Sequence, residues 1–462
     1  MIHHYDAIII GSGQGGTPLS IRLAKAGYKT ALIERNEIGG SCINYGCIPS
    51  KAIIASSKTA HDLVNASALG INAKSHSIDF KKIMKRKNDI VARFRGGSTN
   101  NLEETENLDI IYGEASFSSN KELIVVEENG NAKKVSSEKI FINIGLRPAV
   151  PNIDGLNKVP FLTSTEILEL KEIPEHLIIL GAGYISLELA QAFSRLGSKV
   201  TILESEEQIL GREDDDVRAE IASFFNEEKI KIITNAKVTK VTKTATGKIK
   251  LSYSLPESHK HVSGSHLLVA VGRAPDTNIL ELNNTAIKLN EGGFINVNDR
   301  LETNVAGVYA LGDIKGGPAF THISYNDYQI ILNNILNKTK RSTKGRIIPY
   351  CMFTDPELGR VGITEKEAAQ KGIKIEIAKL PMDKAAKAII DNHTQGFMKA
   401  IVDAKTKKIL GAAILCRDGG NIMSVVQIAM EAGWTYEQLK EQMFAHPLLA
   451  ESLNNLFFTL DK

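Results

Sequence analysis

Apolar and polar positions along the chain repeat one pattern twice. Residues 5–34 read as a strand, a glycine-rich turn, a helix and a second strand, and the same order returns at residues 176–204. In each copy a short apolar run precedes the glycines, and a helix-compatible segment follows them. Two copies of this pattern predict two separate dinucleotide-binding units.

The pattern changes after residue 345. Strand-like segments such as GFMKAIVD and ILGAAIL alternate there with helical segments such as TEKEAAQKG. This alternation predicts a separate α+β domain. The predicted fold class is therefore α/β, with two Rossmann-like dinucleotide-binding domains followed by an α+β domain.

Composition and charge narrow the function classes. The chain has 462 residues, 43% hydrophobic and 24% charged, as expected of a globular protein with roughly two to four domains. A net charge of +3 predicts neither a nucleic-acid nor a membrane partner. The densest basic run, residues 81–87, is interpreted as a solvated helix face. No apolar stretch matches a membrane span, and the start does not resemble a signal peptide, so we expect a cytoplasmic protein.

The first glycine loop has the spacing of a phosphate-binding turn. Gly11, Gly13 and Gly16 form GxGxxG between a strand and a helix. The first glycine makes the tight turn, the second lets backbone amides reach a pyrophosphate, and the third lets helix and strand pack closely. Glu34 ends the next strand, where a carboxylate can bind ribose hydroxyls. This unit is predicted to bind a dinucleotide.

The second loop repeats the pattern with one change. Gly181 and Gly183 match the first two glycines, and Ser186 stands in the third position, where a small residue is tolerated. Glu204 ends the following strand, and a carboxylate there accepts from ribose hydroxyls and repels a 2′-phosphate. The next cation along the chain is Arg212. We therefore predict NADH rather than NADPH as the nucleotide of this unit.

Four cysteines occur in the chain: Cys42, Cys47, Cys351 and Cys416. Four in so long a chain do not form a structural disulfide framework, and a close pair in a reducing compartment is more often catalytic or metal-binding. Cys351 and Cys416 lie in β-type runs and are interpreted as core residues. CxxxxC is not a usual zinc spacing, and no resident metal is predicted. Three histidines without a partner pattern are interpreted as structural: His61, His76 and His393.

The spacing of Cys42 and Cys47 constrains their backbone. Along an ideal helix, five residues separate two Cα atoms by more than about 7 Å, whereas a disulfide needs roughly 4.4–6.8 Å. A bridged pair therefore requires a break in the helix, and Gly46 provides the freedom for one. Amides at a helix start would favour a thiolate. From these residues alone, a redox pair, two buried cysteines and half of a metal site all remain open.

Taken together, the motifs resemble the class I pyridine nucleotide–disulfide oxidoreductases, which include dihydrolipoamide dehydrogenase, glutathione reductase and mercuric reductase. The segment GGSCINYGCIPSK after the first glycine loop carries most of this resemblance. Further matches extend it over almost the whole chain: residues 143–148, 269–278, 303–313, 349–362 and 446–451. The tail and residues 360–372 are most similar to the mercuric-reductase-like branch, which contains a copper reductase linked to reactive-chlorine resistance.

The resemblance implies catalytic roles. Cys47 would be the sulfur next to the flavin, and Cys42 would exchange with the substrate. His446 would act as a general base on the partner subunit's disulfide, and Glu451 would orient it. Ser41 stands where the family usually has threonine, and Leu448 likewise departs from the motif.

The resemblance also implies cofactor positions. Lys51 and Glu188 match the pair beside the flavin N5, Tyr184 matches the aromatic gate over the nicotinamide pocket, and Asp313 would hold the ribitol chain of FAD. The other residues assigned to cofactor binding are Arg35, Ser41, Gly145, Gly272, Arg273 and Gly312.

The resulting prediction is a homodimeric flavoenzyme. We expect an FAD-binding domain at 1–147 and 273–342, an NAD-binding domain at 148–272 and a dimerisation domain at 343–462. Electrons would pass from NADH through FAD to the Cys42–Cys47 disulfide and on to a small-molecule or protein-bound disulfide. One alternative is a metal-ion reductase that uses the same dithiol on mercury or copper. Another is a non-catalytic flavoprotein that acts as a redox sensor.

Overall fold

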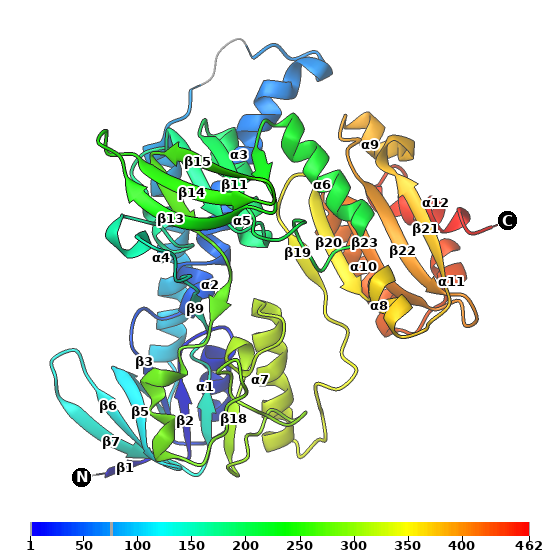
Figure 1. Cartoon of the computed structure of the whole chain (residues 1–462). Coiled ribbons are helices and arrows are strands. Elements are labelled where there is room, and N and C mark those ends of the chain that lie inside the picture. Colours follow the sequence, from blue (N-terminus) through cyan, green and yellow to red (C-terminus); the bar gives the residue numbers. More distant parts are fainter. Residues whose placement is uncertain (1, 74–76, 462) are drawn as a thin grey trace. The chain divides into compact units, whose positions relative to one another are not determined.

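The computed structural model describes residues 2–73 and 77–461, and the chain divides into two compact units (Figure 1). The first unit comprises Met1–Ala52, Met84–Ala149 and Gly272–Arg346. The second comprises Ile53–Ile83, Val150–Val271 and Ile347–Lys462. The three domain boundaries expected from the sequence stay a prediction.

A five-stranded parallel sheet forms the centre of the first unit. Its strand order is β18-β8-β2-β3-β4. The strands are β2 (Ala7–Ile10), β3 (Thr30–Glu34), β4 (Leu108–Tyr112), β8 (Ile140–Ile142) and β18 (Val308–Ala310). Ile8 and Ile10 contribute to one apolar cluster, whereas Ala7 and Ile9 contribute to another. Successive residues therefore serve opposite faces, which explains why the strand is apolar throughout.

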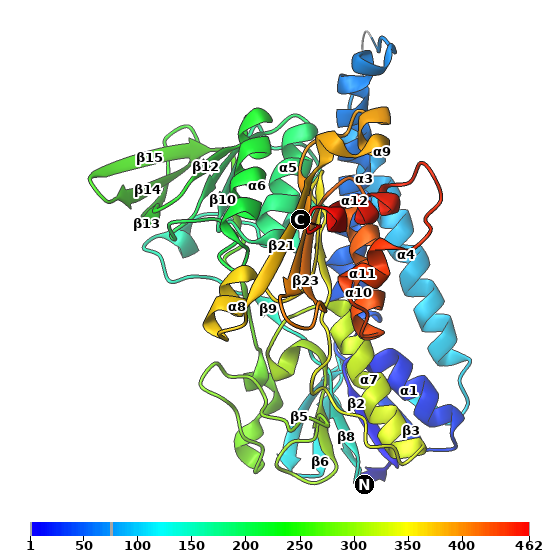
Figure 2. The same ribbon diagram turned by 90° about the vertical axis from the view of Figure 1, so that its right-hand side faces the viewer.

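Helices and two smaller sheets complete the first unit. Helices α1 (Gly16–Lys25) and α7 (Thr321–Leu336) lie side by side (Figure 2). The four-stranded sheet has the order β1-β7-β6-β5. Its strands are β1 (Ile2–His4), β5 (Glu114–Ser119), β6 (Glu122–Val126) and β7 (Ala132–Ser136). Strands β9 (Arg147–Pro148) and β17 (Arg273–Ala274) pair antiparallel, which brings together two of the segments that carry the family resemblance, residues 143–148 and 269–278.

Three helices follow β3 and the first glycine loop. They are α2 (Gly40–Asn44), α3 (Cys47–Asn65) and α4 (Phe80–Glu103). The interpretation of residues 81–87 as a solvated face is wrong at Lys87, which is 1% exposed. Lys87 lies at helical spacing from the buried residues Met84 and Val91, so it falls on the apolar stripe of α4. Lys81, Lys82 and Lys85 are exposed, as predicted.

The second unit contains the repeat of the first pattern. Its parallel sheet has the order β12-β11-β10-β16. The strands are β10 (His176–Leu180), β11 (Lys199–Leu203), β12 (Lys231–Ile233) and β16 (His266–Val269). Helices α5 (Tyr184–Arg195) and α6 (Asp215–Glu227) follow β10 and β11. An antiparallel sheet of β13 (Lys237–Lys243), β14 (Ile249–Leu255) and β15 (Ser258–Gly264) adds to the same part of the chain.

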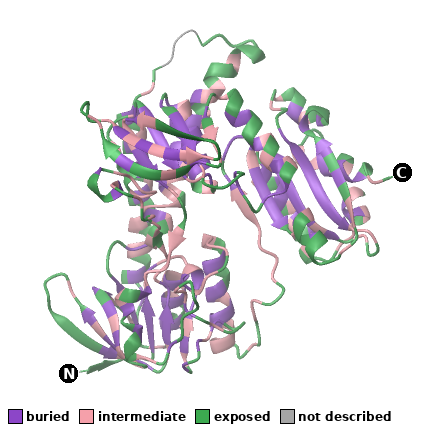
Figure 3. Cartoon of the chain, in the orientation of Figure 1, coloured by how far each residue is buried: buried purple, intermediate pink, exposed green. Residues whose placement is uncertain are grey.

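The segment Ile347–Lys462 of the second unit is the predicted α+β part. Its five-stranded antiparallel sheet has the order β19-β20-β23-β22-β21. The strands are β19 (Tyr350–Met352), β20 (Glu357–Gly362), β21 (Ile375–Pro381), β22 (Phe397–Asp403) and β23 (Ile409–Cys416). The helices are α8 (Glu365–Gln370), α9 (Ala386–Ile390), α10 (Gly419–Glu431), α11 (Tyr436–Lys440) and α12 (Ser452–Phe458). The central strands β22 and β23 are almost entirely buried (Figure 3).

Short 3₁₀ turns connect these elements. They are η1 (Ala66–Leu69), η2 (Leu156–Lys158), η3 (Glu166–Glu169), η4 (Thr277–Leu280), η5 (Leu282–Asn284), η6 (Gly312–Lys315), η7 (Met382–Lys384) and η8 (Leu449–Glu451). Across residues 2–73 and 77–461, every helix is too short or too polar to cross a membrane. The architecture agrees with the predicted α/β fold of two parallel-sheet units and an α+β part.

Candidate active site

The backbone breaks between the two close cysteines, as their spacing requires of a pair that can be bridged. Cys42 lies in α2, whereas Cys47 is the first residue of α3. A Cβ on Gly46 would stand 2.8 Å from the carbonyl oxygen of Ser41 and 3.3 Å from Cys42 Cα. Glycine therefore lets the chain fold back closely on the first cysteine. Both cysteines are free thiols in this structure, and their side chains are hydrogen-bonded to each other.

The two thiols differ in their electrostatic surroundings. The hydrogen bond to Cys47, followed by burial, raises the pKa of Cys42 well above its usual range. Cys47 stands at the start of α3, where free amides and the helix dipole favour a thiolate. Thr321 Oγ1, at the start of α7, lies 3.6 Å from Cys47 Sγ. A proton shared within the pair is therefore held more tightly by Cys42.

The first glycine loop forms a cradle in the same unit. Gly11 has φ +97°, and a Cβ there would lie 2.5 Å from the carbonyl oxygen of Asn143. A Cβ on Gly40 would lie 2.8 Å from Gly13 Cα, and one on Gly16 would lie 2.0 Å from the carbonyl oxygen of Gly11. Side chains at these positions would collide with neighbouring backbone, so only glycine lets the loop pack closely enough to turn its amides towards a pyrophosphate.

Glu34 closes this cradle at the end of β3. Its Oε2 accepts hydrogen bonds from the backbone N of Ser12 at 2.8 Å and from Ser12 Oγ at 2.7 Å. The carboxyl group is thereby oriented beside the loop, as its predicted role in binding ribose hydroxyls requires.

Asn143, which the sequence reasoning missed, connects the loop to two other segments. Its Oδ1 accepts from the backbone N of Gly16 at 2.9 Å. Its Nδ2 donates to the carbonyl oxygen of Leu311 at 2.9 Å and to Ser324 Oγ at 3.2 Å. A buried amide that makes these three bonds ties the first glycine loop to residues 303–313, another segment that carries the family resemblance. The sequence pattern that could have indicated Asn143 is a polar residue directly after the apolar strand residues 140–142.

Charged groups hold the end of the segment 303–313, which contains Gly312 and Asp313. Asp313 Oδ2 accepts from Arg273 Nη1 at 2.7 Å, and Arg273 Nη2 donates to the carbonyl oxygen of Leu146 at 3.1 Å. The fully buried Asp327 accepts a hydrogen bond from the backbone N of Gly312 at 2.9 Å. The sequence did not indicate Asp327 as a site residue. These contacts present Asp313 beside the paired strands β9 and β17. The glycine cradle and the two carboxylates, Glu34 and Asp313, fit FAD.

The contacts of the other residues expected to bind FAD do not test that role. Arg35 forms ion pairs with Glu114 at 3.5 Å and Asp276 at 3.7 Å. Gly145 and Gly272 have positive φ angles with open space where a Cβ would stand, and Ser41 is exposed in α2. Their roles stay predictions.

The second glycine loop repeats the hydrogen bond between a loop amide and the acid at the end of the next strand. Glu204 Oε2 accepts from the backbone N of Ala182 at 2.6 Å, as Glu34 does from Ser12. Gly181 has φ +93°, and a Cβ there would lie 2.7 Å from the carbonyl oxygen of Ala270. Ser186, in the third position, donates from Oγ to that same oxygen at 3.2 Å. The departure from glycine therefore adds a bond between α5 and the end of β16.

Tyr184 and Glu188 lie on α5 directly after this loop. The Tyr184 hydroxyl donates to Glu213 Oε1 at 2.7 Å, and Glu188 Oε1 accepts from the backbone N of Phe353 at 2.9 Å. Lys51 is half-buried on α3 in the first unit, whereas Glu188 belongs to the second. The pairing of these two side chains stays a prediction.

His446 and Glu451 meet near the C-terminus, as the motif implied. His446 Nδ1 lies 2.9 Å from Glu451 Oε2 and 3.0 Å from Oε1, and the His446 side chain is 69% exposed. A carboxylate on Nδ1 favours the tautomer whose Nε2 is free to accept a proton. The pair therefore has the arrangement of an oriented general base.

The other two cysteines, two further histidines and a cluster of carboxylates are buried, partly buried or bound to neighbouring side chains. Cys416 is fully buried and Cys351 half-buried. His61 hydrogen-bonds Asn65 and His393 hydrogen-bonds Arg417, whereas His76 lies outside the described residues. A group of three carboxylates lies close together: Asp214, Asp216 and Glu365. Lys399 Nζ is within 2.9 Å of all three, so a lysine neutralises them.

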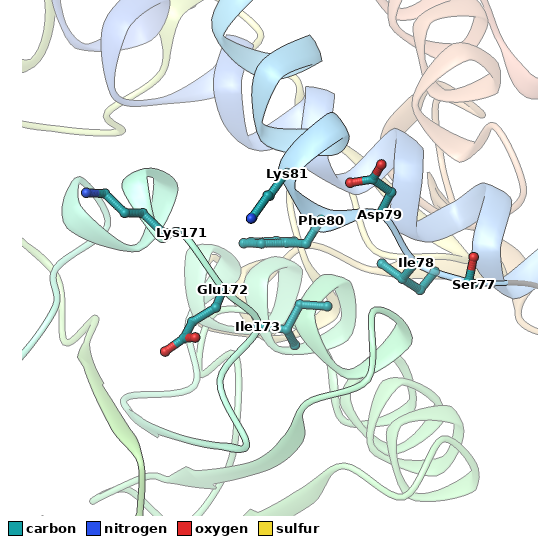
Figure 4. Close-up of a pocket in the computed structure, with 8 residues that line it drawn as sticks. All are labelled: Ser77, Ile78, Asp79, Phe80, Lys81, Lys171, Glu172 and Ile173. Atoms are coloured by element: carbon teal, nitrogen blue, oxygen red, sulfur yellow. The ribbon is translucent and has the colours of Figure 1, made fainter.

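Figure 4 shows a pocket in the second unit whose lining includes none of the predicted site residues. It is lined by Ser77, Ile78, Asp79, Phe80, Lys81, Lys171, Glu172 and Ile173. Phe80 packs against Phe193 with ring centroids 6.3 Å apart. Its lining contains no cysteine, histidine or glycine loop, and it offers none of the chemistry expected from the sequence.

Comparisons with known proteins agree with this geometry. Residues 5–327 match the pyridine nucleotide-disulphide oxidoreductase family, and residues 348–457 match the dimerisation domain of that family. The chain is 40% identical over 460 residues to the probable pyridine nucleotide-disulfide oxidoreductase RclA of Escherichia coli strain K12, which covers 99% of each chain. It is 33% identical to a mercuric reductase of Staphylococcus aureus, over 99% of this chain and 83% of that protein.

A solved structure matches the whole fold. The Cu(II) complex of the HOCl-induced flavoprotein disulfide reductase RclA from Escherichia coli superposes with a TM-score of 0.91 at 39% identity and covers 100% of both chains. The dimerisation domain implies a homodimer. The chain therefore belongs to the pyridine nucleotide-disulphide oxidoreductase family and is a flavoprotein disulfide reductase of the RclA type, with Cys42 and Cys47 as its redox-active pair.

Proposed function

We propose that this enzyme takes electrons from NADH and delivers them through the Cys42–Cys47 pair to an acceptor outside the protein. The observation that carries the proposal is the pair itself, folded back over Gly46 at the start of α3. FAD, when bound, would supply the two-electron transfer between nicotinamide and disulfide. Glu204 would select NADH, and the glycine cradle with Glu34 and Asp313 would hold FAD.

The unequal thiols support distinct roles. Cys47, the sulfur proposed next to the flavin, would accept the electron pair, so that opening the disulfide would release Cys42, which takes up a proton, and would leave Cys47 as the thiolate at the helix start. Cys42, whose pKa is raised by its bond to Cys47, would keep its proton until a base removes it. His446 of the partner subunit, oriented by Glu451, would be that base. The acceptor proposed first is a small-molecule or protein-bound disulfide.

A second acceptor, Cu(II), is favoured by one specific observation. A solved relative that covers the whole chain is described as a Cu(II) complex, and a mercuric reductase is also among the relatives. Two thiolates are soft ligands that suit copper and mercury. The same dithiol can therefore serve either acceptor class. The non-catalytic alternative is disfavoured because both cysteines and the His446–Glu451 pair are in place.

Turnover against a panel of acceptors tests the proposal. NADH oxidation by the FAD-loaded protein is measured with lipoamide, glutathione disulfide, Cu(II) and Hg(II). Cys47→Ser should abolish turnover of every acceptor that depends on the pair, whereas Cys351→Ser, outside the pair, is the matched control. Equal rates in wild type and Cys47→Ser for all four acceptors would contradict the proposal. Fractionation of cells that produce the protein tests the proposed cytoplasmic location.

A further inference from the structure

A buried carboxylate links Tyr184 to the α+β part of the second unit. Glu213 lies between β11 and α6, and its side chain is fully buried. Its Oε1 accepts two hydrogen bonds of 2.7 Å each, one from the Tyr184 hydroxyl and one from the Tyr350 hydroxyl. The two tyrosine rings pack together with centroids 5.6 Å apart. One oxygen therefore holds both rings.

The charge of Glu213 has its own counter-ion. Arg360 Nε, on β20, lies 3.0 Å from Glu213 Oε2 in an ion pair whose geometry falls short of an aligned hydrogen bond. Arg360 is also buried and donates from Nη1 to the carbonyl oxygen of Ala412 at 2.8 Å. A buried carboxylate is stable only when it is paired and hydrogen-bonded. Arg360 and the two hydroxyls meet this requirement together.

The hydroxyls are permanent donors at ordinary pH. Burial and then the charge of Glu213 raise the pKa of Tyr184, and the same two causes raise the pKa of Tyr350 to about 12. Both phenols therefore stay protonated and can donate to the carboxylate. A hydrogen bond to an ionised acceptor is stronger than one between neutral groups.

The sharing of one oxygen has a mechanical consequence. Tyr184 is the first residue of α5, directly after the glycines of the second dinucleotide loop, where a bound nucleotide would meet the helix start. If the Tyr184 ring moves, Glu213 keeps Arg360 and the Tyr350 hydroxyl. Tyr184 can therefore leave without stranding a buried charge, because Tyr350 remains as the second donor.

We infer that Glu213 is a positioning residue that holds Tyr184 over the nucleotide site through the hydrogen bond from the Tyr184 hydroxyl, which we call the latch. The latch can open because Tyr350, the standing partner, keeps its own hydrogen bond to Glu213 Oε1. This inference rests on the proposed function, in which NADH binds at the second loop. Tyr184 matches the aromatic residue that the resemblance places over the nicotinamide pocket, where a bound nucleotide would have to displace the ring. The apparent affinity of the nucleotide would then depend on the fraction of molecules in which the bond between Tyr184 and Glu213 is open. The latch thereby couples nucleotide binding to β19 and β20.

Two conservative variants separate the roles of the hydroxyls. Tyr184→Phe keeps the ring and removes the latch bond, so the open form becomes more populated and NAD⁺ should bind about five- to tenfold more tightly. Tyr350→Phe removes the standing partner, so opening leaves Glu213 Oε1 without a donor and NAD⁺ should bind more weakly by a similar factor. Tyr253→Phe, a buried tyrosine on β14, is the control and should bind as wild type does.

The measurement is calorimetric titration of NAD⁺ into the FAD-loaded protein, with the rate of flavin bleaching by NADH followed by stopped flow. Circular dichroism checks that each variant is folded. Opposite changes in the two variants support the latch, whereas a merely structural role predicts unchanged or weaker binding in both. Normal binding by wild type with equal affinities in both variants would overturn the latch and leave the proposed function intact. A wild-type protein that binds neither NAD⁺ nor NADP⁺ would overturn both.

Discussion

The carboxylate of Glu204 accepts a 2.6 Å hydrogen bond from the backbone N of Ala182, which places it beside the second glycine loop. Ser12 and Glu34 form the corresponding contact in the first unit at 2.8 Å. In both copies the acid that ends the second strand is therefore oriented by the second residue of the loop. A carboxylate held there can accept from ribose hydroxyls and repels a 2′-phosphate.

NADH is expected to give a higher kcat/KM than NADPH for this reason. Glu204→Ser should remove the repulsion and reduce the preference by about tenfold or more, since two like charges at close range interact by several kcal/mol. Side-by-side steady-state rates with both donors test this. Glu207→Ser, an exposed neighbour, is the control. A wild-type preference for NADPH would contradict the assignment of Glu204.

The two redox cysteines should differ in their spectra. Cys42→Ser leaves a thiol at the start of α3, where a thiolate is favoured, and should show a long-wavelength charge-transfer band with oxidised flavin. Cys47→Ser should lack this band. Absorbance spectra of both purified variants decide the order, and reversed or identical spectra would show that the assignment is wrong.

His446→Ala should separate the two acceptor classes. General-base assistance is typically worth about 100- to 10,000-fold, so turnover of lipoamide should fall within that range while reduction of flavin by NADH is retained. Reduction of Cu(II) should fall much less, because thiolate ligands rather than a proton relay bind the metal.

A sizing column accompanies these rates, with His259→Ala on the exposed strand β15 as the control. Dissociation of His446→Ala into monomers would indicate an interfacial role instead. A dimer with unchanged lipoamide turnover would show that His446 is not the base.

Asn143→Ala should weaken FAD binding and stability. The substitution leaves the backbone N of Gly16 and the carbonyl oxygen of Leu311 without their partner in a buried site, which costs about 1–3 kcal/mol for each unsatisfied group. Flavin release on dilution and the Tm of the apoprotein measure the two effects. Ser324→Ala removes only one of the three bonds of Asn143 and should give a smaller loss. Equal losses in both variants would argue against the central role of Asn143.

Cys416 should resist alkylation in the folded protein. Burial raises its pKa to about 12, so at pH 8 the group remains a protonated thiol, which is not the nucleophile. Mass spectrometry after treatment with N-ethylmaleimide should find Cys416 unmodified in buffer and modified in denaturant. Modification in buffer at the rate of a free thiol would contradict the expected burial.

Some of the site could be predicted because it depends on local sequence. The order of strand, glycine turn and helix sets the loop, and the position of the acid after the second strand sets Glu34 and Glu204. A bridged Cys42–Cys47 pair required a break in the helix, for which Gly46 offered the freedom, and the structure places a break between α2 and α3. His446 and Glu451, five residues apart, likewise meet locally. Short-range geometry of the backbone is sufficient for the loops and the cysteine pair, whereas the pairing of His446 with Glu451 was implied by the family resemblance.

Other relationships were decided only by tertiary structure. Asn143 reaches Ser324 across 181 positions of the chain, and Tyr350 reaches Glu213 across 137. Both residues lie in segments that match the family, but neither segment indicates the partner, because the partner arrives through the packing of separate elements. Lys87 is the converse case, in which a charged residue in a basic run is buried by the helical face on which it lies. The spacing of nearby residues can be read directly from the sequence, whereas the contacts between distant residues depend on how strands and helices pack.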